Sequence, residues 1–380
     1  MRHAEDTEER QQFREMTRRF TETELLPFAN DWDEAGEIPW EIHEKVGALG
    51  AWGFGVAEQY GGLGFDDMYM RCIWGEEAAR AHNGGTLAAL GGRSISIGPI
   101  EKFASQDIKD RILKDIVEGR TGSSLGVTEP GGGSDVANMK TTARQDGNHW
   151  IINGSKTFIT GGMTSDYFVV GARTGGEGLN GISLFLVEKD MEGFSRTALD
   201  KKMGWWASDQ ATLYFDDVRV PAGNMLGDEG RGFIQIMHNF NYERLGMVAQ
   251  CLGMMRVLLE ESIAYAQQRE TFGKPLSQHQ VIRHKIAEIS ARVDATEAWV
   301  NQICFLTENG QMPVDQICKA KFFSTKNLEY CASEAMQIWG GAAYLRGNVV
   351  ERFYREVKVM AIGGGSEEIM RDLAVRQMGL

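Results

Sequence analysis

The sequence has no apolar run that approaches the roughly 20 residues of a membrane-spanning helix. Its first residues, Met1–Arg19, are polar and lack the apolar segment of a secretory signal. Lys and Arg number 40 against 53 Asp and Glu, a formal charge of -13, and the sequence shows no basic cluster. Binding to a phosphate backbone needs such a cluster, so nucleic acid is not an expected partner. We expect a soluble cytoplasmic protein without a membrane span.

Paired metal-ligand motifs are also missing. The five cysteines are an odd number without a C-x-x-C pair, which indicates reduced thiols in a cytoplasm. The seven histidines form no H-x-x-x-H or H-E-x-x-H motif, and the nearest pair, His279 and His284, would project from different faces of a helix. We therefore expect the cysteines to be small apolar residues of helices, and we expect no metal site.

Proline is scarce, with seven residues, whereas glycine is abundant, with 46 of 380. An excess of glycine without proline is not a low-complexity composition. The glycines occur in clusters, which are typical of places where the backbone turns sharply or approaches a ligand closely. With 42% hydrophobic residues, the chain is long enough to bury a large core in more than one domain.

Hydrophobic periodicity divides the chain into three regions and predicts an α+β fold. Residues 1–121 have helical spacing, and residues 122–229 contain short β-type runs separated by turns, one of them a hairpin turn predicted at Asn153-Gly154. Residues 230–380 regain helical spacing, and the first helix there should be about 50 Å long at 1.5 Å per residue. The prediction is an N-terminal helical domain, a middle β barrel or sandwich and a C-terminal four-helix bundle. The bundle helices are expected over 232–267, 278–307, 313–341 and 348–362.

Three segments have the chemistry of a binding site, although each also has an ordinary structural interpretation. Val127–Asp135 is a Gly-rich turn whose backbone N–H groups can hold an anionic or polar ring, or simply connect two strands. Asn153–Thr160 ends in an aromatic and a hydroxyl residue, which can contact a planar cofactor or pack in a hairpin core. Arg269–Gly273 and Gln337–Gly341 suit a pyrophosphate, or act as helix caps.

The order of these segments indicates a known family, because the chain resembles the acyl-CoA dehydrogenases along nearly its whole length. The matching stretches are V-T-E-P-G-G-G-S-D from Val127, D-G-N-H-W-I-I-N-G-S-K-T-F-I-T from Asp146, K-M-G-W from Lys202, F-D-D-V-R-V-P from Phe215, R-E-T-F-G from Arg269, Q-I-W-G-G from Gln337 and Y-R-E-V-K from Tyr354. The resemblance implies the three-domain fold and an FAD-dependent enzyme that dehydrogenates acyl-CoA thioesters, as in fatty acid β-oxidation.

The resemblance also implies cofactor and partner roles. FAD would lie between the β domain and the bundle, in contact with Leu125, Val127, Thr128, Gly133, Ser134, Phe158, Ile159, Thr160 and Ser366. Phe158 replaces the more usual Trp, which removes a ring N–H but keeps an aromatic face for stacking. A neighbouring subunit would complete the pyrophosphate and adenine side with Arg269, Thr271, Phe272, Gln280, Gln337, Gly340 and Gly341. A homo-oligomer follows, a dimer of dimers by family habit, with electron-transferring flavoprotein as electron acceptor.

Dehydrogenation needs one carboxylate to remove the α proton. Many family members carry this Glu in the C-terminal segment, where this chain has Gly364, while Glu367 and Glu368 match the start of the following helix. Branches that include the isovaleryl-CoA and long-chain dehydrogenases carry the base in an E-R-L context on the first bundle helix, which here begins at Glu243. Taken alone, Glu243 beside Arg244 would be a surface ion pair. With the resemblance, Glu243 is the predicted base, and the backbone N–H of Gly364 is the predicted oxyanion donor.

The resemblance places the acyl pocket near residues 83–99 and Gly246. The glycines there either leave room for a branched, cyclic or long acyl group or allow close helix packing. Ser134 and Arg244 are further candidates for substrate contacts. Arg93 can meet a polar acyl tail or lie exposed at a helix end. Trp206 is a candidate for the thioester entrance.

Three alternatives remain open at this point. The acyl group can be bound to a carrier protein instead of CoA. A relative that uses oxygen, as an oxidase or monooxygenase, has the same fold. A flavin- or acyl-binding scaffold without a base is the third alternative, and it gains support if Glu243 points to solvent.

Overall fold

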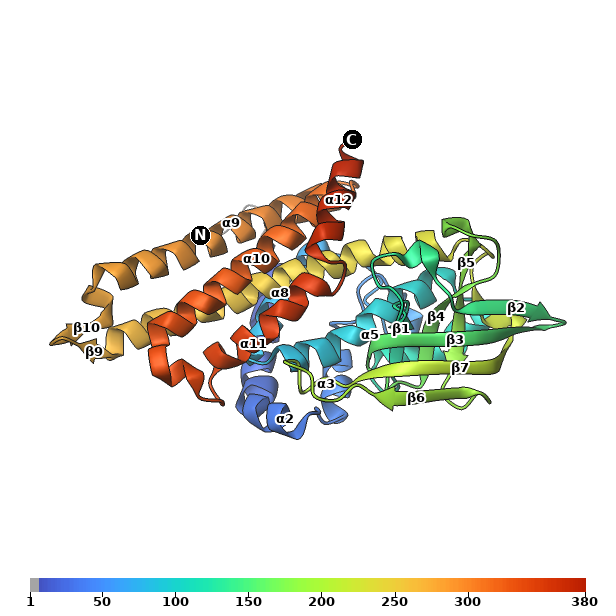
Figure 1. The fold of residues 1–380 in the computed structure, drawn as a ribbon, viewed down its shortest axis with the longest axis horizontal. Coiled ribbons are helices and arrows are strands. Elements are labelled where there is room, and N and C mark those ends of the chain that lie inside the picture. The colour runs from blue at the N-terminus through green and yellow to red at the C-terminus, as the bar shows by residue number, and fades with distance from the viewer. Residues whose placement is uncertain (1–6) are drawn as a thin grey trace.

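The computed structural model describes residues 7–380, apart from the side chains of residues 93 and 94. Helices come first, an eight-stranded sheet follows, and a helical bundle forms the rest of the chain (Figure 1). The sheet lies at one end of the molecule, the bundle at the other, and one long helix, α8, connects them (Figure 1). The predicted α+β class and the order of its three parts are confirmed.

The N-terminal helices have sequence-encoded starts. The side chain of Asp67 accepts a hydrogen bond of 2.9 Å from the N–H of Met70, and Asn83 does the same for Thr86 at 3.0 Å. These N-caps fix the first turns of α4 and α5, the two helices that reach the cavity described below. The helices are α1 (Glu8–Phe20), α2 (Ala29–Ala35), α3 (Glu41–Ala48), α4 (Met68–Ala78), α5 (Gly84–Phe103), α6 (Gln106–Ile108) and α7 (Lys114–Val117).

The middle sheet has the strand order β6-β7-β3-β2-β4-β5-β8, and β1 pairs in parallel with β4. Alternate side chains from several strands, including Trp150, Phe168, Phe185 and Phe215, form a separate apolar core. The strands are β1 (Ser123–Gly126), β2 (Thr142–Asp146), β3 (His149–Thr160), β4 (Tyr167–Arg173), β5 (Ile182–Glu188), β6 (Phe194–Ala198), β7 (Gln210–Pro221) and β8 (Met225–Leu226).

The predicted hairpin turn at Asn153-Gly154 is wrong. Strand β3 continues through both residues, and the turn between β2 and β3 lies at residues 147–148, where Gly147 has a φ of 59°. Gly154 instead lies at a register shift between β3 and β7 and packs against Thr141, whose hydroxyl would be 2.6 Å from an added Cβ. Glycine serves tight turns and close backbone approaches equally well, so the dipeptide alone does not distinguish them.

The C-terminal bundle confirms the four predicted helices and the following helix, whose start was expected at Glu367 and Glu368. Its helices are α8 (Gly232–Gln268), α9 (Gln280–Glu308), α10 (Val314–Trp339), α11 (Val349–Ile362) and α12 (Glu367–Gln377), and a small hairpin of β9 (Glu270–Thr271) and β10 (Lys274–Pro275) joins the first two. Helix α10 lies in the centre and contacts all the other four. At 37 residues, α8 is about 55 Å long.

The five cysteines are buried and unpaired on helices, as predicted, with Cys72 on α4 and the other four on bundle helices. Cys72 of α4 and Cys304 of α9 have their sulfurs 3.5 Å apart and form part of the core between the N-terminal helices and the bundle. Within residues 7–380, we find no helix with the length and apolar character needed to cross a bilayer.

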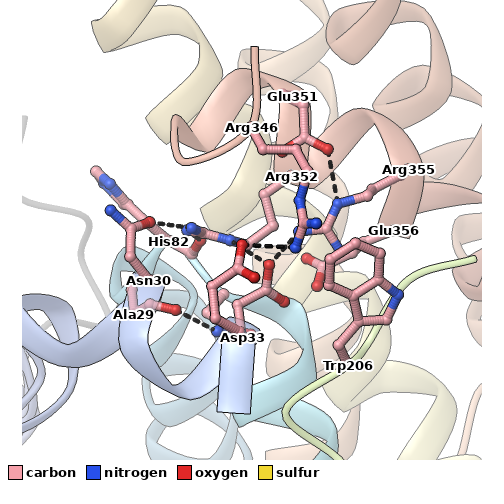
Figure 2. Close-up of polar contacts among 12 residues, drawn as sticks. Ala29, Asn30, Asp33, His82, Trp206, Arg346, Glu351, Arg352, Arg355 and Glu356 are labelled. Carbon is pink, nitrogen blue, oxygen red and sulfur yellow. Dashed lines mark hydrogen bonds and ion pairs between the residues drawn. The ribbon is translucent and has the colours of Figure 1, made fainter. Parts of the chain in front are cut away.

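A buried polar cluster fixes the N-terminal helices against the bundle (Figure 2). Asp33 of α2 accepts hydrogen bonds from Arg352, at 3.3 Å, and from Arg355, both on α11. One turn of α11 also supplies Glu356, which accepts the N–H of Gly84 at the start of α5 at 2.8 Å. The guanidinium of Arg355 lies 3.8 Å from the ring centroid of Trp206, so the middle part of the chain joins the cluster through a cation–π contact.

We expect Asp33→Ala to destabilise the protein, because both guanidiniums are then left nearly buried without their common acceptor. Breaking a buried pair costs about 3–5 kcal/mol of unfolding free energy. Asp146→Ala is the matched control, since its ion pair with Arg219 is half exposed and should contribute about 1 kcal/mol or less. Thermal and denaturant unfolding measures both variants, and equal losses would contradict the role of the cluster.

Candidate active site

A cavity of about 1420 Å³ lies where the three parts of the chain meet. It exceeds the roughly 300–1,000 Å³ of a typical small-molecule pocket, so it has room for two ligands side by side. Twelve of the predicted site residues line it: Leu125, Val127, Thr128, Gly133, Ser134, Phe158, Ile159, Thr160, Glu243, Arg244, Gly364 and Ser366. Trp206 is not among the lining residues, whereas Trp205 is.

The Gly-rich turn at residues 127–135 forms one wall of the cavity, and a buried ion pair holds it on β3. The ammonium of Lys156 donates to Glu129 Oε1 at 2.8 Å and to Val127 O at 3.3 Å. Glu129 also accepts the N–H groups of Lys140 and Thr141 at 2.7 and 2.8 Å. Burial opposes ionisation of Glu129, but the charge of Lys156 and these hydrogen bonds outweigh it and lower its pKa to about 2. The turn is therefore a built surface with a fixed backbone.

Phe158 faces the cavity because β3 bulges at this residue. The pairing of β3 with β7 shifts register between Lys156 and Ile159, and Phe158 has a left-handed φ of 58°. Bulges of this kind turn a side chain away from its regular direction. The ring is 67% exposed and lines the cavity instead of packing in the sheet core. The interpretation of Phe158 as a hairpin core residue is thus excluded, and a strained backbone at this position is typical of a functional site.

Glu243 lies on α8 and lines the same cavity. Its Oε2 is buried and has no hydrogen-bond partner in the described part of the chain. Burial raises its pKa to about 7, although the charges of Arg244 and Lys321 act in the opposite direction. A carboxyl with a free oxygen and a pKa near neutrality can accept a proton from a ligand in the cavity.

Gly364 lies directly beside Glu243. A Cβ added to Gly364 would be 3.6 Å from Glu243 Oε1 and 2.6 Å from the sulfur of Met247, and its φ of 64° also favours glycine. The two positions considered for the base in the sequence analysis therefore converge on one place in the cavity. Only one of them has a carboxylate in this chain.

The turn at residues 363–365 is held from behind by two cations. Arg244 Nε donates to Gly364 O at 3.0 Å, while Lys321 Nζ donates to Gly363 O at 2.8 Å and to Gly365 O at 2.6 Å. Sequence reasoning missed Lys321, as it missed the pair of Lys156 and Glu129. A signal was present, because Lys321 occupies a core-spaced position among the buried residues of α10.

The other acidic candidates differ from Glu243 in position or pairing. Glu367 and Glu368 begin α12 as predicted, and Glu367 pairs with Arg371 at 3.0 Å. Burial also raises the pKa of Glu356 to about 7, but Glu356 accepts the Gly84 N–H and does not line the cavity. Glu101, on the last turn of α5, lines the cavity and has a buried Oε2 without a partner. Among the described carboxylates it is the rival that shares these features, and it lacks the neighbouring Gly364 turn.

The glycines predicted to border the acyl pocket serve both of the roles considered for them. Among the described residues, a Cβ added to Gly91 or Gly246 would meet nothing within 4 Å, so these two leave open space. A Cβ on Gly92 would lie 2.9 Å from the Thr160 methyl, and those on Gly84 and Gly85 would also clash, so these three permit close packing. The side chain of Arg93 is outside the described part of the structure.

The second set of predicted FAD residues does not line the cavity. It lies at the opposite end of α8, around the β9/β10 hairpin and the end of α10 (Figure 1). Its members are mainly exposed, and Phe272 reaches 96% exposure with a left-handed φ of 51°. The set comprises Arg269, Thr271, Phe272, Gln280, Gln337, Gly340 and Gly341. A single chain therefore does not bring the two sets together.

Comparison with known proteins identifies the family. The acyl-CoA dehydrogenase N-terminal, middle and C-terminal domain profiles match residues 7–120, 124–218 and 230–379. The mitochondrial long-chain specific acyl-CoA dehydrogenase of Mus musculus is 34% identical over 369 residues, covering 96% of this chain and 85% of that protein. The chain belongs to the acyl-CoA dehydrogenase family and is an FAD-dependent oxidoreductase.

Solved structures agree with this assignment. A putative acyl-CoA dehydrogenase from Mycobacterium smegmatis superposes with a TM-score of 0.95 at 38% identity over 98% of both chains. A glutaryl-CoA dehydrogenase from the same organism, in complex with FADH2, gives a TM-score of 0.91 at 28% identity over 98% of this chain and 95% of that one. The cavity suits a flavin, since it offers an exposed aromatic ring at Phe158 beside the fixed Gly-rich turn.

We expect Lys156→Met to loosen the Gly-rich turn, because Glu129 is then left buried without its cation. The variant should unfold at lower temperature and lose FAD more readily during gel filtration than the wild type. Lys140→Met is the control, since Lys140 is exposed and its side chain contacts only Asn138 among the hydrogen bonds described. Normal FAD retention by Lys156→Met, measured as the ratio of flavin to protein absorbance, would refute this role.

Proposed function

We propose that the protein dehydrogenates an acyl-CoA thioester to the trans-2-enoyl-CoA, with Glu243 as the base that removes the α proton. The observation that carries the proposal is the buried, unpartnered Oε2 of Glu243 in the cavity, beside Gly364. It favours an enzyme over a base-less scaffold, because Glu243 faces a ligand cavity.

The cavity-lining residues of the β domain would hold the flavin ring. Phe158 offers a face for stacking, and Thr160, with Leu125, Val127, Thr128 and Ile159, forms the adjoining wall. Bound FAD supplies the acceptor for the hydride that leaves the β carbon. Gly133, Ser134 and Ser366 border this region, and Ser366 also caps α12 through its hydroxyl.

The proton side of the reaction is assigned to residues of the chain itself. Glu243 takes the α proton onto its free oxygen, and a pKa of about 7 keeps a large fraction of it ionised at neutral pH. The Gly364 N–H donates to the thioester oxygen, on which negative charge develops as the proton leaves. A backbone N–H does not depend on the side chain. Gly364 therefore keeps this donor, although the carboxylate proposed as the base is at position 243.

Glu243→Gln should lower kcat by about 10²–10⁴-fold, the usual contribution of a general base. In the wild type, kcat should rise with pH through about 7 and level off above it, since only the ionised Glu243 accepts the proton. Anaerobic bleaching of the flavin by acyl-CoAs measures both the loss of rate in Glu243→Gln and the pH dependence of the wild type. Glu101→Gln is the control, and loss of bleaching in that variant with retention in Glu243→Gln would move the base to Glu101.

The Glu243→Gln variant also tests how the Glu243 carboxyl affects the stability of the protein. The pKa of Glu243 is raised from 4.5, so the folded protein holds this proton more tightly than the unfolded chain. Its contribution to stability therefore falls as pH rises from about 4.5 to 7. Glu243→Gln should accordingly unfold at a higher temperature than the wild type at pH 8, which also shows that lost activity is not lost folding.

The open space at Gly91 and Gly246 supports a long or branched acyl group as the substrate. The long-chain specificity in the name of the mouse relative points the same way. The thioester and CoA portion would pass Ser134 and Arg244, both in the cavity wall.

Gly246→Val should fill this space and lower kcat/KM for long acyl-CoAs by about 10- to 200-fold, the range for one or two misplaced carbon groups. Butyryl-CoA should be affected much less. Ala264→Val places the same valine side chain at an exposed position of α8 and is the control. An equal loss for short and long substrates would contradict a pocket at Gly246.

An assembly of at least two chains is part of the proposal. The residues around Arg269 and Gln337 are exposed and far from the cavity, so they are available to the FAD of a neighbouring subunit. We place electron-transferring flavoprotein as the acceptor of the electrons, in line with the family resemblance.

A further inference from the structure

Lys321 is a fully buried cation that pairs with backbone instead of with an acid. Its side chain has 0% exposure, and the two hydrogen bonds of its ammonium go to Gly363 O and Gly365 O. Among the described residues, no carboxylate lies within ion-pair distance of it. Burying an ammonium in this way is costly, and burial lowers the pKa of Lys321 to about 8. Stability alone therefore does not account for a lysine at this core position.

The two carbonyls that Lys321 binds determine the direction of the neighbouring N–H groups. In a planar trans peptide, the N–H of one residue points opposite to the C=O of the residue before it. The Gly363 carbonyl points to Lys321, so the Gly364 N–H points away from Lys321. Consecutive glycines have no preferred conformation of their own, so this direction must be imposed from outside.

Arg244 and Lys321 bind different carbonyls of the 363–365 turn. Arg244 binds the middle carbonyl, of Gly364, but it also lines the cavity and can contact a ligand directly. Lys321 is not among the lining residues. Its effect on a ligand must therefore pass through the turn, or through its charge, which already acts on Glu243.

We propose that Lys321 is a positioning residue of the dehydrogenation. It holds the 363–365 turn so that the Gly364 N–H meets the thioester oxygen, and its charge balances the negative charge that moves from Glu243 to this oxygen. In this step the C–H bond at the α carbon breaks, its proton goes to Glu243, and the electron pair is shared with the thioester carbonyl. The inference rests on the proposed function.

Lys321→Met and Lys321→Gln in the FAD-loaded enzyme test this role. We expect Lys321→Met to keep its FAD and to bind the enoyl-CoA product within about threefold of the wild type. Its kcat should fall by about 10²–10³-fold, the usual effect of losing an oxyanion donor. Its affinity for a 3-oxoacyl-CoA, whose acidic α carbon allows it to bind as the enolate, should fall more than tenfold relative to the product.

Lys321→Gln separates the hydrogen bonds from the charge. Its amide N–H groups can donate to the turn, so part of the lost kcat should return. Both variants should shift the acid limb of kcat to higher pH, because removing the ammonium raises the pKa of Glu243. Lys319→Met, at a partly exposed ion pair with Asp315 on the same helix, should change none of these quantities.

The inference is overturned if Lys321→Met keeps kcat within about threefold of the wild type. It is also overturned if product and 3-oxoacyl-CoA affinities fall in equal proportion, since that indicates a purely structural role. If Lys321→Met does not retain FAD, the affinities for the enoyl-CoA product and for the 3-oxoacyl-CoA are compared in Lys321→Gln instead. Equal losses of the two affinities in that variant also overturn the inference. Failure of the proposed function would appear separately, as a wild type that no acyl-CoA bleaches or as unchanged bleaching in Glu243→Gln.

Discussion

A carboxyl held in an apolar cavity with one oxygen unpartnered is the constraint around which this molecule is organised. Water would satisfy Glu243 at lower cost, so the surrounding structure must offset the loss of hydration. Three separate parts of the chain meet at its cavity, and each has buried polar contacts whose disruption costs more than that of surface ion pairs. This loss of stability is consistent with the general rule that titratable groups with perturbed pKa values cluster at functional sites.

Buried cations hold segments of the chain in place at three sites. Lys156 holds the Gly-rich turn on one side of the cavity, Lys321 and Arg244 hold the 363–365 turn on the other, and Arg352 ties α11 to α2. In the first two cases the segment that is held is glycine-rich and would otherwise be free to adopt many conformations. Rigid walls around a reacting group are what geometric control of proton transfer requires.

Much of the fold could be predicted from the sequence, because long helices and alternating strands have periodicities that local reading detects. The bundle helices, the start of α12 and the helix carrying Glu243 all lie where the pattern places them. The convergence of Glu243 and Gly364 came from the family resemblance, since 121 residues separate the two in sequence and no local pattern connects them.

Other features depend on contacts that periodicity does not contain. The exposure of Phe158 follows from a bulge set by pairing between β3 and β7, and Asn153-Gly154 has the composition of a turn although its neighbours keep it extended. The two functions of the pocket glycines differ only in what faces each one. Lys321 has the sequence spacing of a core residue, and its role becomes visible only when the carbonyls of a distant turn are placed beside it.

The contact between Gly364 and Glu243 also limits how such enzymes can diverge. A glutamate at position 364 would adopt a left-handed backbone, displace Met247 and place a second carboxylate against the first, so one of the two would hold its proton. The reverse change, loss of Glu243 alone, leaves no base at this place. On the role proposed for Glu243, moving the base to position 364 of this chain would therefore require coordinated replacements at positions 243, 247 and 364.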